Sequence, residues 1–202
     1  MFAVSPNYDS SKLQSGMLAD KIDVFEDQMN NWLLAHAHSL ASPDYPTSQH
    51  TGFAILTLVG SYFETIASFM QGQSSKNKAG EFFSIGFRNV FPEFETQVVA
   101  KGVTDVAAEL RRVADAYYTE IRCGLFHEAM VRAGTVIVKG ANHTIQVVED
   151  PTTKNLRLEV DPFHLLNRVQ SHFTSYISKL RNTNEVQTRT NFEKEWDRRT
   201  QG

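Results

Sequence analysis

The segment that decides the fold is residues 105–127, DVAAELRRVADAYYTEIRCGLFH. Its apolar residues recur every three or four positions, which is the period of one face of an α-helix. The resulting core stripe consists of Leu110, Val113, Tyr117, Ile121 and Leu125. The segment therefore predicts a long helix that begins at Asp105, extends slightly past His127 and packs in the core of the protein.

Two segments upstream show the same helical period. The first ends at two prolines, Pro43 and Pro46, and carries an apolar stripe at Leu18, Ile22, Phe25, Met29, Trp32 and His36. The second spans roughly residues 48–71 and is apolar on most of its circumference, as expected of a helix in the middle of a bundle. Because His36 lies on the first stripe, we interpret it as a structural core histidine. The first ten residues are expected to form a loose arm.

Downstream of a polar loop at 71–80, the sequence predicts a short aromatic helix over 81–90, stopped at Phe91-Pro92. After the long helix the period changes to two. Three alternating runs within 135–160 predict a small antiparallel β-meander: Val136 and Val138, then Ile145 and Val147, then Leu156, Leu158 and Val160. Asp161-Pro162 restarts a helix, with Asp161 as its N-cap and proline at the first helical position.

These elements predict a mainly α fold, an antiparallel bundle of four to five helices with the β-meander inserted before the last long helix. The bundle and the meander are expected to form one domain over residues 1–182. Residues 183–202 are mixed in charge and are expected to form a polar C-terminal tail. Phe192 and Trp196 indicate that this tail docks on another surface.

Composition narrows the class of protein. The chain has 202 residues, 41% of them hydrophobic, and a net charge of -3, which argues against coating nucleic acid by charge alone. The single cysteine, Cys123, excludes an intrachain disulfide and suits a reducing cytoplasm. The N-terminus shows no secretory signal, and the most apolar stretch, 53–70, carries Glu64, Gly60 and several hydroxyl residues. We therefore expect a cytoplasmic protein whose apolar helix is buried in the bundle and does not span a membrane.

The candidate site lies on the long helix. Arg122 supplies a permanently charged fork that fits phosphate, and His127 supplies a side chain that moves protons near neutral pH. On a regular α-helix a five-residue step leaves roughly 140° between two side chains, so the pair would diverge. Two arrangements would bring them together. One is a local π-type widening, made easier by Gly124; the other is a groove completed by a second copy of the chain.

Two further residues are candidates for supporting roles. Glu64 lies on the polar strip of the apolar second helix, and a buried carboxylate needs a partner. It either orients Arg122 or His127, or makes a hydrogen bond inside the bundle. Tyr118, one turn before Arg122, either stacks on a base or packs in the core or an interface. The histidine and cysteine spacings predict no metal site, and no glycine-rich phosphate loop indicates a cofactor.

The stretch Glu120-Ile121-Arg122-Cys123-Gly124-Leu125-Phe126-His127-Glu128 resembles the HEPN superfamily (higher eukaryotes and prokaryotes nucleotide-binding domains). In that family an arginine is followed after four to six residues by a histidine, near the start of the last long helix of a helical bundle. The resemblance covers mainly residues 105–130, and the bundle extends it loosely over 12–182. It implies metal-independent RNA cleavage by a homodimer, with Arg122 and His127 as the catalytic pair. It also implies a toxin–antitoxin or phage-defence setting, with an antitoxin or operon partner.

The implied chemistry is physically sound. An imidazole with an ordinary pKa of about 6.5 can take the proton of a ribose 2′-hydroxyl, and a guanidinium can stabilise the charge that builds on the phosphorus centre. The alternative is a non-catalytic module of the same fold that binds RNA or a nucleotide, or that packs on a partner protein. Many catalytic family members carry a polar residue directly after the arginine, so Cys123 at that position favours the alternative.

Overall fold

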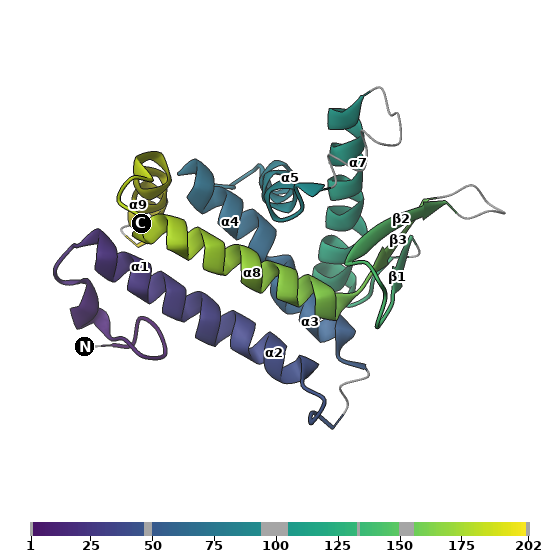
Figure 1. Cartoon of the computed structure of the whole chain (residues 1–202), viewed down its shortest axis with the longest axis horizontal. Helices are drawn as coiled ribbons and strands as arrows, with labels where there is room; N and C mark the ends of the chain where they lie inside the picture. Colours follow the sequence, from purple (N-terminus) through teal and green to yellow (C-terminus); the bar gives the residue numbers. More distant parts are fainter. Residues whose placement is uncertain (1, 47–49, 94–104, 133, 150–155, 201–202) are drawn as a thin grey trace.

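The structure is a computed structural model that describes residues 2–46, 50–93, 105–132, 134–149 and 156–200. Helices dominate, and a three-stranded sheet lies at one end of the protein (Figure 1). The helices are η1 (Ser10–Leu13), α1 (Leu18–Asp27), η2 (Gln28–Leu34), α2 (Ala35–Ala41), α3 (Gly52–Gly60), α4 (Tyr62–Gln71), α5 (Ala79–Val90), α7 (Val106–Tyr117), η4 (Tyr118–Glu128), α8 (Pro162–Arg181) and α9 (Val186–Thr200). The predicted class, a mainly α bundle with a small sheet before the long helix α8, is confirmed.

Aromatic side chains between α4, α5 and α7 form one part of the core. Phe63 on α4 is fully buried, and its ring centroid lies 5.1–6.2 Å from those of its neighbours Phe83, Phe87, Phe91 and Tyr117. The helix backbones also touch at Gly86, where a Cβ would lie only 1.9 Å from the carbonyl oxygen of Phe63. Since only glycine lacks a Cβ, the packing of α5 on α4 depends on this residue.

The apolar second helix is confirmed, with two differences. It begins at Gly52 among the described residues, and a turn at Ser61 divides it into α3 and α4. The start predicted at residue 48 lies outside the described residues. Among the described residues, one helical segment, Gly52–Gln71, is long enough and apolar enough to cross a membrane. However, 56% of its most apolar part is buried inside the fold. Its apolar surface is therefore used as core.

The first helix is present, but its predicted apolar stripe fails halfway along. Phe25 is buried as expected, whereas Trp32 is 51% exposed and His36 is exposed. Leu34 and Ala37 are buried in their place. The interpretation of His36 as a core histidine is wrong. The reason is the π-helix η2, which fits an extra residue into the turn and rotates every later position away from the face predicted by a constant helical period.

The three alternating runs are strands, β1 (Thr135–Ile137), β2 (Ile145–Glu149) and β3 (Leu156–Val160). They do not form the predicted antiparallel meander. β3 is the central strand, β2 pairs with it antiparallel and β1 pairs with it parallel. The chain after β1 crosses the end of β3, where the Asp161 carboxylate accepts hydrogen bonds from the N–H groups of Gly140 at 2.7 Å and Ala141 at 3.1 Å. β2 therefore arrives on the far side of β3.

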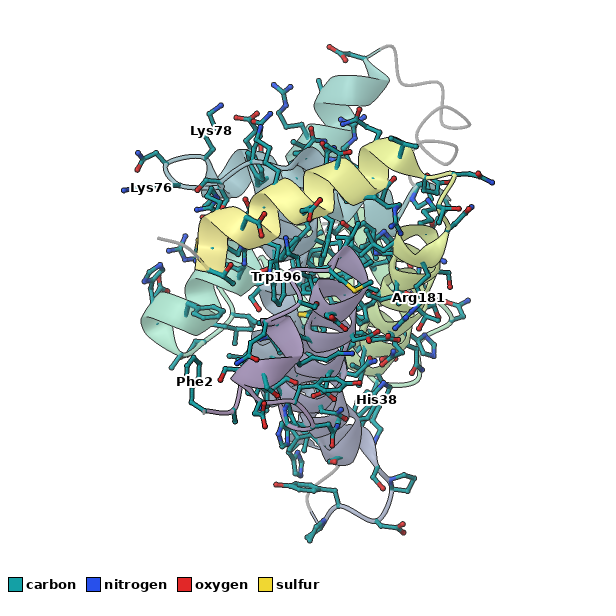
Figure 2. All side chains as sticks on the ribbon, turned by 90° about the vertical axis from the view of Figure 1, so that its left-hand side faces the viewer. Phe2, His38, Lys76, Lys78, Arg181 and Trp196 are labelled. Atoms are coloured by element: carbon teal, nitrogen blue, oxygen red, sulfur yellow. The ribbon has the colours of Figure 1, made fainter. Side chains whose placement is uncertain are left out.

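Within the predicted polar tail at 183–202, Val186–Thr200 is a helix, α9, that packs on the bundle. Phe192 is fully buried, Trp196 is 6% exposed, and both rings stand close to Phe25 of α1, at 5.3 and 6.4 Å. Figure 2 shows Trp196 beside the N-terminal helix. Lys21 on α1 adds ion pairs to Glu193 at 2.9 Å and Asp197 at 2.8 Å. The docking indicated by the two aromatic residues is thus confirmed, because they cover the end of the core.

The N-terminal arm is also bound, not loose. The Asn7 backbone and side-chain amides donate hydrogen bonds of 2.8 and 2.6 Å to the Asp27 carboxylate at the end of α1. The Gln28 side chain donates to the Val4 carbonyl at 2.7 Å. These polar contacts span about twenty residues of sequence, which is why helical periodicity did not reveal them.

The hydrogen bonds to the Asp27 carboxylate predict that the stability of the protein depends on pH in the acid range. Burial raises the pKa of Asp27, but the neighbouring Ser5 side chain and hydrogen bonds from Asn7 and Asn31 lower it by more, from 3.8 to about 2. A lowered pKa in the folded state means that the stabilisation is complete above about pH 4 and is lost as the pH falls toward 2. We expect Asp27→Asn to cost about 1–2 kcal/mol at pH 7 and to flatten the fall in unfolding free energy between pH 4 and 2. Urea titrations at each pH test this, with exposed Asp44→Asn as a control that should parallel wild type.

Candidate functional site

The helix that carries Arg122 and His127 changes its geometry just before them. α7 begins at the N-cap Asp105, whose carboxylate accepts from the Ala108 N–H at 2.9 Å, and continues as an α-helix to Tyr117. From Tyr118 to Glu128 the chain is a π-helix, η4. In a π-helix hydrogen bonds join residues five apart, so residues at this spacing lie on one face. The predicted π-type widening is confirmed, and helix geometry then brings residues five apart, such as Arg122 and His127, closer together than a regular α-helix would.

Gly124 lets the chain fold back tightly at the end of η4. The helix ends at Ala129, which has a left-handed φ of 55°. The following segment then returns along the helix, where the Met130 N–H donates to the Gly124 carbonyl at 3.3 Å and the Arg132 N–H to the Glu120 carbonyl at 3.0 Å. A Cβ on Gly124 would lie 2.5 Å from the Met130 carbonyl oxygen. Glycine is thus required here by close packing, beyond any ease of helix distortion.

Arg122 is held in a fixed orientation. Its side chain is 22% exposed, and its terminal nitrogen lies 3.5 Å from a carboxylate oxygen of Glu64 on α4. The guanidinium carbon stands 5.5 Å from the ring centre of Tyr118 and 4.8 Å from that of Phe126, within the range of cation–π attraction. Its Nε is buried without a hydrogen-bond partner among the described residues. The guanidinium is therefore positioned from two sides and keeps an unused donor.

Glu64 links this arginine to a surface loop. Of the roles considered for Glu64, contact with Arg122 is the one that the structure shows. Its other carboxylate oxygen accepts a hydrogen bond of 2.7 Å from the Ser75 hydroxyl, in the loop between α4 and α5. Lys76 and Lys78 project outward from the same loop (Figure 2). Two exposed cations thus belong to the loop that anchors the partner of Arg122.

His127 lies at the surface of the helix. It is exposed, and so are its neighbours Phe126 and Met130, at 49% and 61%. Glu128 beside it is bound by Arg132 at 2.6 and 3.0 Å. This bond, followed by the charges of Arg132 and His127, lowers the pKa of the Glu128 carboxyl. His127 is therefore free of core packing and open to a ligand, next to an apolar surface.

The two tyrosines before the pair have different environments. Tyr117 is fully buried, as predicted for core packing. Tyr118 is half-buried, with its ring edge-on to Phe83 at 5.2 Å and near the guanidinium of Arg122. Burial, followed by the neighbouring Cys123, raises the pKa of the Tyr118 hydroxyl. Tyr118 is thus a wall of the arginine site in this structure, and its use as a stacking platform for a base stays a prediction.

Sequence reasoning did not identify the contacts of Phe126 and Ser75. Phe126 follows Arg122 by four positions, a spacing that places two side chains side by side on a helix and was therefore a usable signal. Ser75 is forty-seven positions away from Arg122 and reaches the site only through Glu64. Its role depends on how α4, α5 and η4 pack together, so no local pattern predicts it.

The comparisons neither support nor contradict the family resemblance. Comparison of the chain with protein-family models, with curated proteins and with solved structures gives no match. Membership of the HEPN superfamily stays a prediction, based on Arg122, His127 and the helical bundle. In the described part of the chain, no group of three or more His, Cys, Asp or Glu side chains is arranged to hold a metal ion.

Proposed function

We propose that this protein is a HEPN-like endoribonuclease that cleaves RNA without a metal ion, with Arg122 and His127 as its catalytic pair. The observation that supports the proposal is the π-helix Tyr118–Glu128, in which residues five apart lie closer together than on an α-helix, with His127 exposed. We place the protein in the cytoplasm, in a toxin–antitoxin or defence system with an antitoxin or operon partner. The toxin–antitoxin or defence setting rests on the family resemblance alone.

The reaction would be an internal transesterification. The His127 imidazole takes the proton of a ribose 2′-hydroxyl, and the 2′-oxygen attacks the adjacent phosphorus. The bond between phosphorus and the 5′-oxygen breaks, and an imidazolium returns a proton to that oxygen. The Arg122 guanidinium stabilises the negative charge on the phosphorane, held in place by Glu64 at 3.5 Å. The products are a 2′,3′-cyclic phosphate and a 5′-hydroxyl.

A homodimer fits this chemistry and the exposed apolar side chains. One imidazole must otherwise act as both base and acid, whereas a second copy would supply another. Phe126 and Met130 flank His127 and are 49% and 61% exposed, so a partner that covered them would bury apolar surface beside the site. Lys76 and Lys78 would add attraction for the RNA backbone from the neighbouring loop.

One observation favours a second candidate, a non-catalytic module that binds a nucleotide, RNA or a protein. Glu64 lies 3.5 Å from Arg122, and a carboxylate at this distance offsets part of the positive charge that a phosphorane would need. Such a module would use the Arg122 fork for binding and would leave RNA intact. The same variants separate the two candidates, because binding and cleavage are measured independently.

We expect purified protein to cleave structured and single-stranded RNA in the presence of EDTA and to leave 2′,3′-cyclic phosphate ends. His127→Ala should lower the cleavage rate by about 10²–10⁴-fold, the usual contribution of a positioned acid–base group. Arg122→Ala should lower it by about 10²-fold or more, because a charge-stabilising donor is lost. Rates from labelled RNA on gels, with mass spectrometry of the ends, measure both effects.

His36→Ala is the matched control, since His36 is an exposed histidine on a helix remote in sequence from the pair. It should cleave at the wild-type rate. Light scattering of the same samples reports whether the active species is a dimer. Intact RNA with wild-type dimers, or equal rates for His127→Ala and wild type, would overturn the proposed nuclease. RNA binding that is lost in Arg122→Ala without any cleavage would establish the binding module.

A further inference from the structure

A second candidate site lies between α5, α8 and α9. It is a cavity of about 450 Å³, within the usual size range of small-molecule pockets. One face of α8 forms a wall of it, with residues at alternating steps of three and one: Arg168, Ser171, His172, Ser175, Tyr176 and Lys179. None of the described residues lining it is a carboxylate, and none is among the described contacts of Arg122. The cavity is therefore cationic and separate from the Arg122–His127 pair.

The hydroxyl of Tyr176 is the clearest sign that this cavity takes a ligand. Tyr176 lines the cavity and is only 4% exposed. Its hydroxyl is buried and has no hydrogen-bond partner among the described residues. A buried polar group without a partner costs free energy, and a ligand acceptor that reached this hydroxyl would remove that cost.

His172 lies one turn before Tyr176 and adds a second neutral donor. Its Nδ1 is 2.7 Å from the hydroxyl oxygen of Tyr62. Burial, reinforced by the charges of Lys179 and Arg168, lowers the pKa of His172 to about 4, so the imidazole is neutral at pH 7. When the Tyr62 hydroxyl donates to Nδ1, the hydrogen of the ring lies on Nε2 and is available to an acceptor.

The two cationic side chains of this wall, Arg168 and Lys179, differ in whether they already have ion-pair partners. Arg168 holds Glu93 at 2.5 Å and donates to the Val90 carbonyl at 2.8 Å. Lys179 is exposed and has no ion pair within the described residues. Because the two cations lie three turns apart, roughly 16 Å along the helix axis, the uncompensated charge is at the Lys179 end. Val90 and Pro92 line the cavity with apolar surface near Arg168.

We propose that this cavity binds a small organic phosphate, a phosphate monoester that carries an apolar or aromatic group. The phosphate oxygens would accept from the Lys179 ammonium and the Tyr176 hydroxyl, with His172 as a further donor. The apolar group would extend toward Val90 and Pro92. This function is additional to RNA cleavage and does not depend on it.

Calorimetric titration of the full chain with three probes tests the proposal. Phenyl phosphate should bind, inorganic phosphate should bind at least about tenfold more weakly because it leaves the apolar end empty, and phenol should give no measurable binding. Lys179→Ala should weaken phenyl phosphate at least about tenfold. Tyr176→Phe should weaken it about fivefold while leaving the unfolding midpoint of the free protein unchanged or higher, since it removes an unpaired hydroxyl.

Lys194→Ala is the matched control, because Lys194 is an exposed lysine of α9 that does not line the cavity. It should bind phenyl phosphate as wild type does, and so should Arg122→Ala, which makes this proposal fail or succeed independently of the nuclease. Absence of phenyl phosphate binding to wild type would overturn the site. Equal weakening by Lys179→Ala and Lys194→Ala would also overturn it, as would a lower unfolding midpoint in Tyr176→Phe.

Discussion

Gly86→Ala is expected to destabilise the protein by about 3 kcal/mol or more, the upper end of what overpacking costs. The added Cβ would stand 1.9 Å from the carbonyl oxygen of Phe63 and 2.7 Å from its carbonyl carbon. Both atoms belong to the backbone of α4, so no side-chain rotation can make room. The two helices would have to separate, and the aromatic cluster around Phe63 would lose its packing. Urea unfolding followed by circular dichroism measures the loss.

Gly80→Ala is the matched control on the same helix. A Cβ at Gly80 would meet only the Tyr118 ring, at 3.7 and 3.9 Å, which is ordinary van der Waals contact. Alanine also favours helix over glycine by up to about 1 kcal/mol, so this variant should be neutral or slightly more stable. If Gly86→Ala were as stable as Gly80→Ala, the close approach of α4 and α5 would be contradicted.

Asp161→Ala is expected to cost about 3 kcal/mol or more, because one buried carboxylate serves four backbone donors. It is fully buried and caps α8 by accepting from the N–H groups of Phe163 at 2.9 Å and His164 at 3.1 Å. It also accepts from Gly140 and Ala141, and so ties the connection between β1 and β2 to the helix. Alanine would leave these donors unsatisfied and would release the sheet from α8.

Asp105→Ala provides the comparison, since Asp105 is also an N-cap but is exposed and, among the described contacts, accepts only from the N–H of Ala108. Its loss should cost about 1 kcal/mol. Unfolding midpoints of both variants, with chemical shifts of the strand residues, measure the contrast. Equal losses in the two variants would mean that the crossing connection adds nothing to the cap, and would refute the role assigned to Asp161.

Local periodicity was sufficient to identify α5, α7, α8 and the strands. Each has a stop or start signal in the sequence, such as Phe91-Pro92 after α5 and Asp161-Pro162 before α8, and these signals act on the neighbouring backbone alone. Periodicity failed beyond Gln28, where η2 rotates Trp32 and His36 out of the core. A sequence pattern with one constant helical period cannot reveal the π-helix η2. The extra residue of that helix is accommodated by packing on neighbouring helices, which the local sequence does not show.

The candidate site shows the same division. Arg122, His127 and Gly124 were visible in the sequence, and a widening of the helix was one of the two arrangements that it predicted for the first two. The contact of Glu64 with Arg122 was one of several roles open to a carboxylate in the bundle. The Ser75 hydroxyl that holds Glu64, at 2.7 Å, belongs to a loop with no distinguishing pattern. Its position follows from the packing of α5 on α4.

The sequence by itself determined the mainly α bundle, the position of the sheet before α8 and the location of the Arg122–His127 pair, because helical and strand periods and caps are properties of adjacent residues. Only the tertiary structure decided the parallel pairing of β1 with β3, the surface on which α9 docks and the binding of the N-terminal arm. It also decided the cavity lined by His172, Tyr176 and Lys179. These features arise between segments far apart in the chain, where the partner of a residue is set by three-dimensional packing.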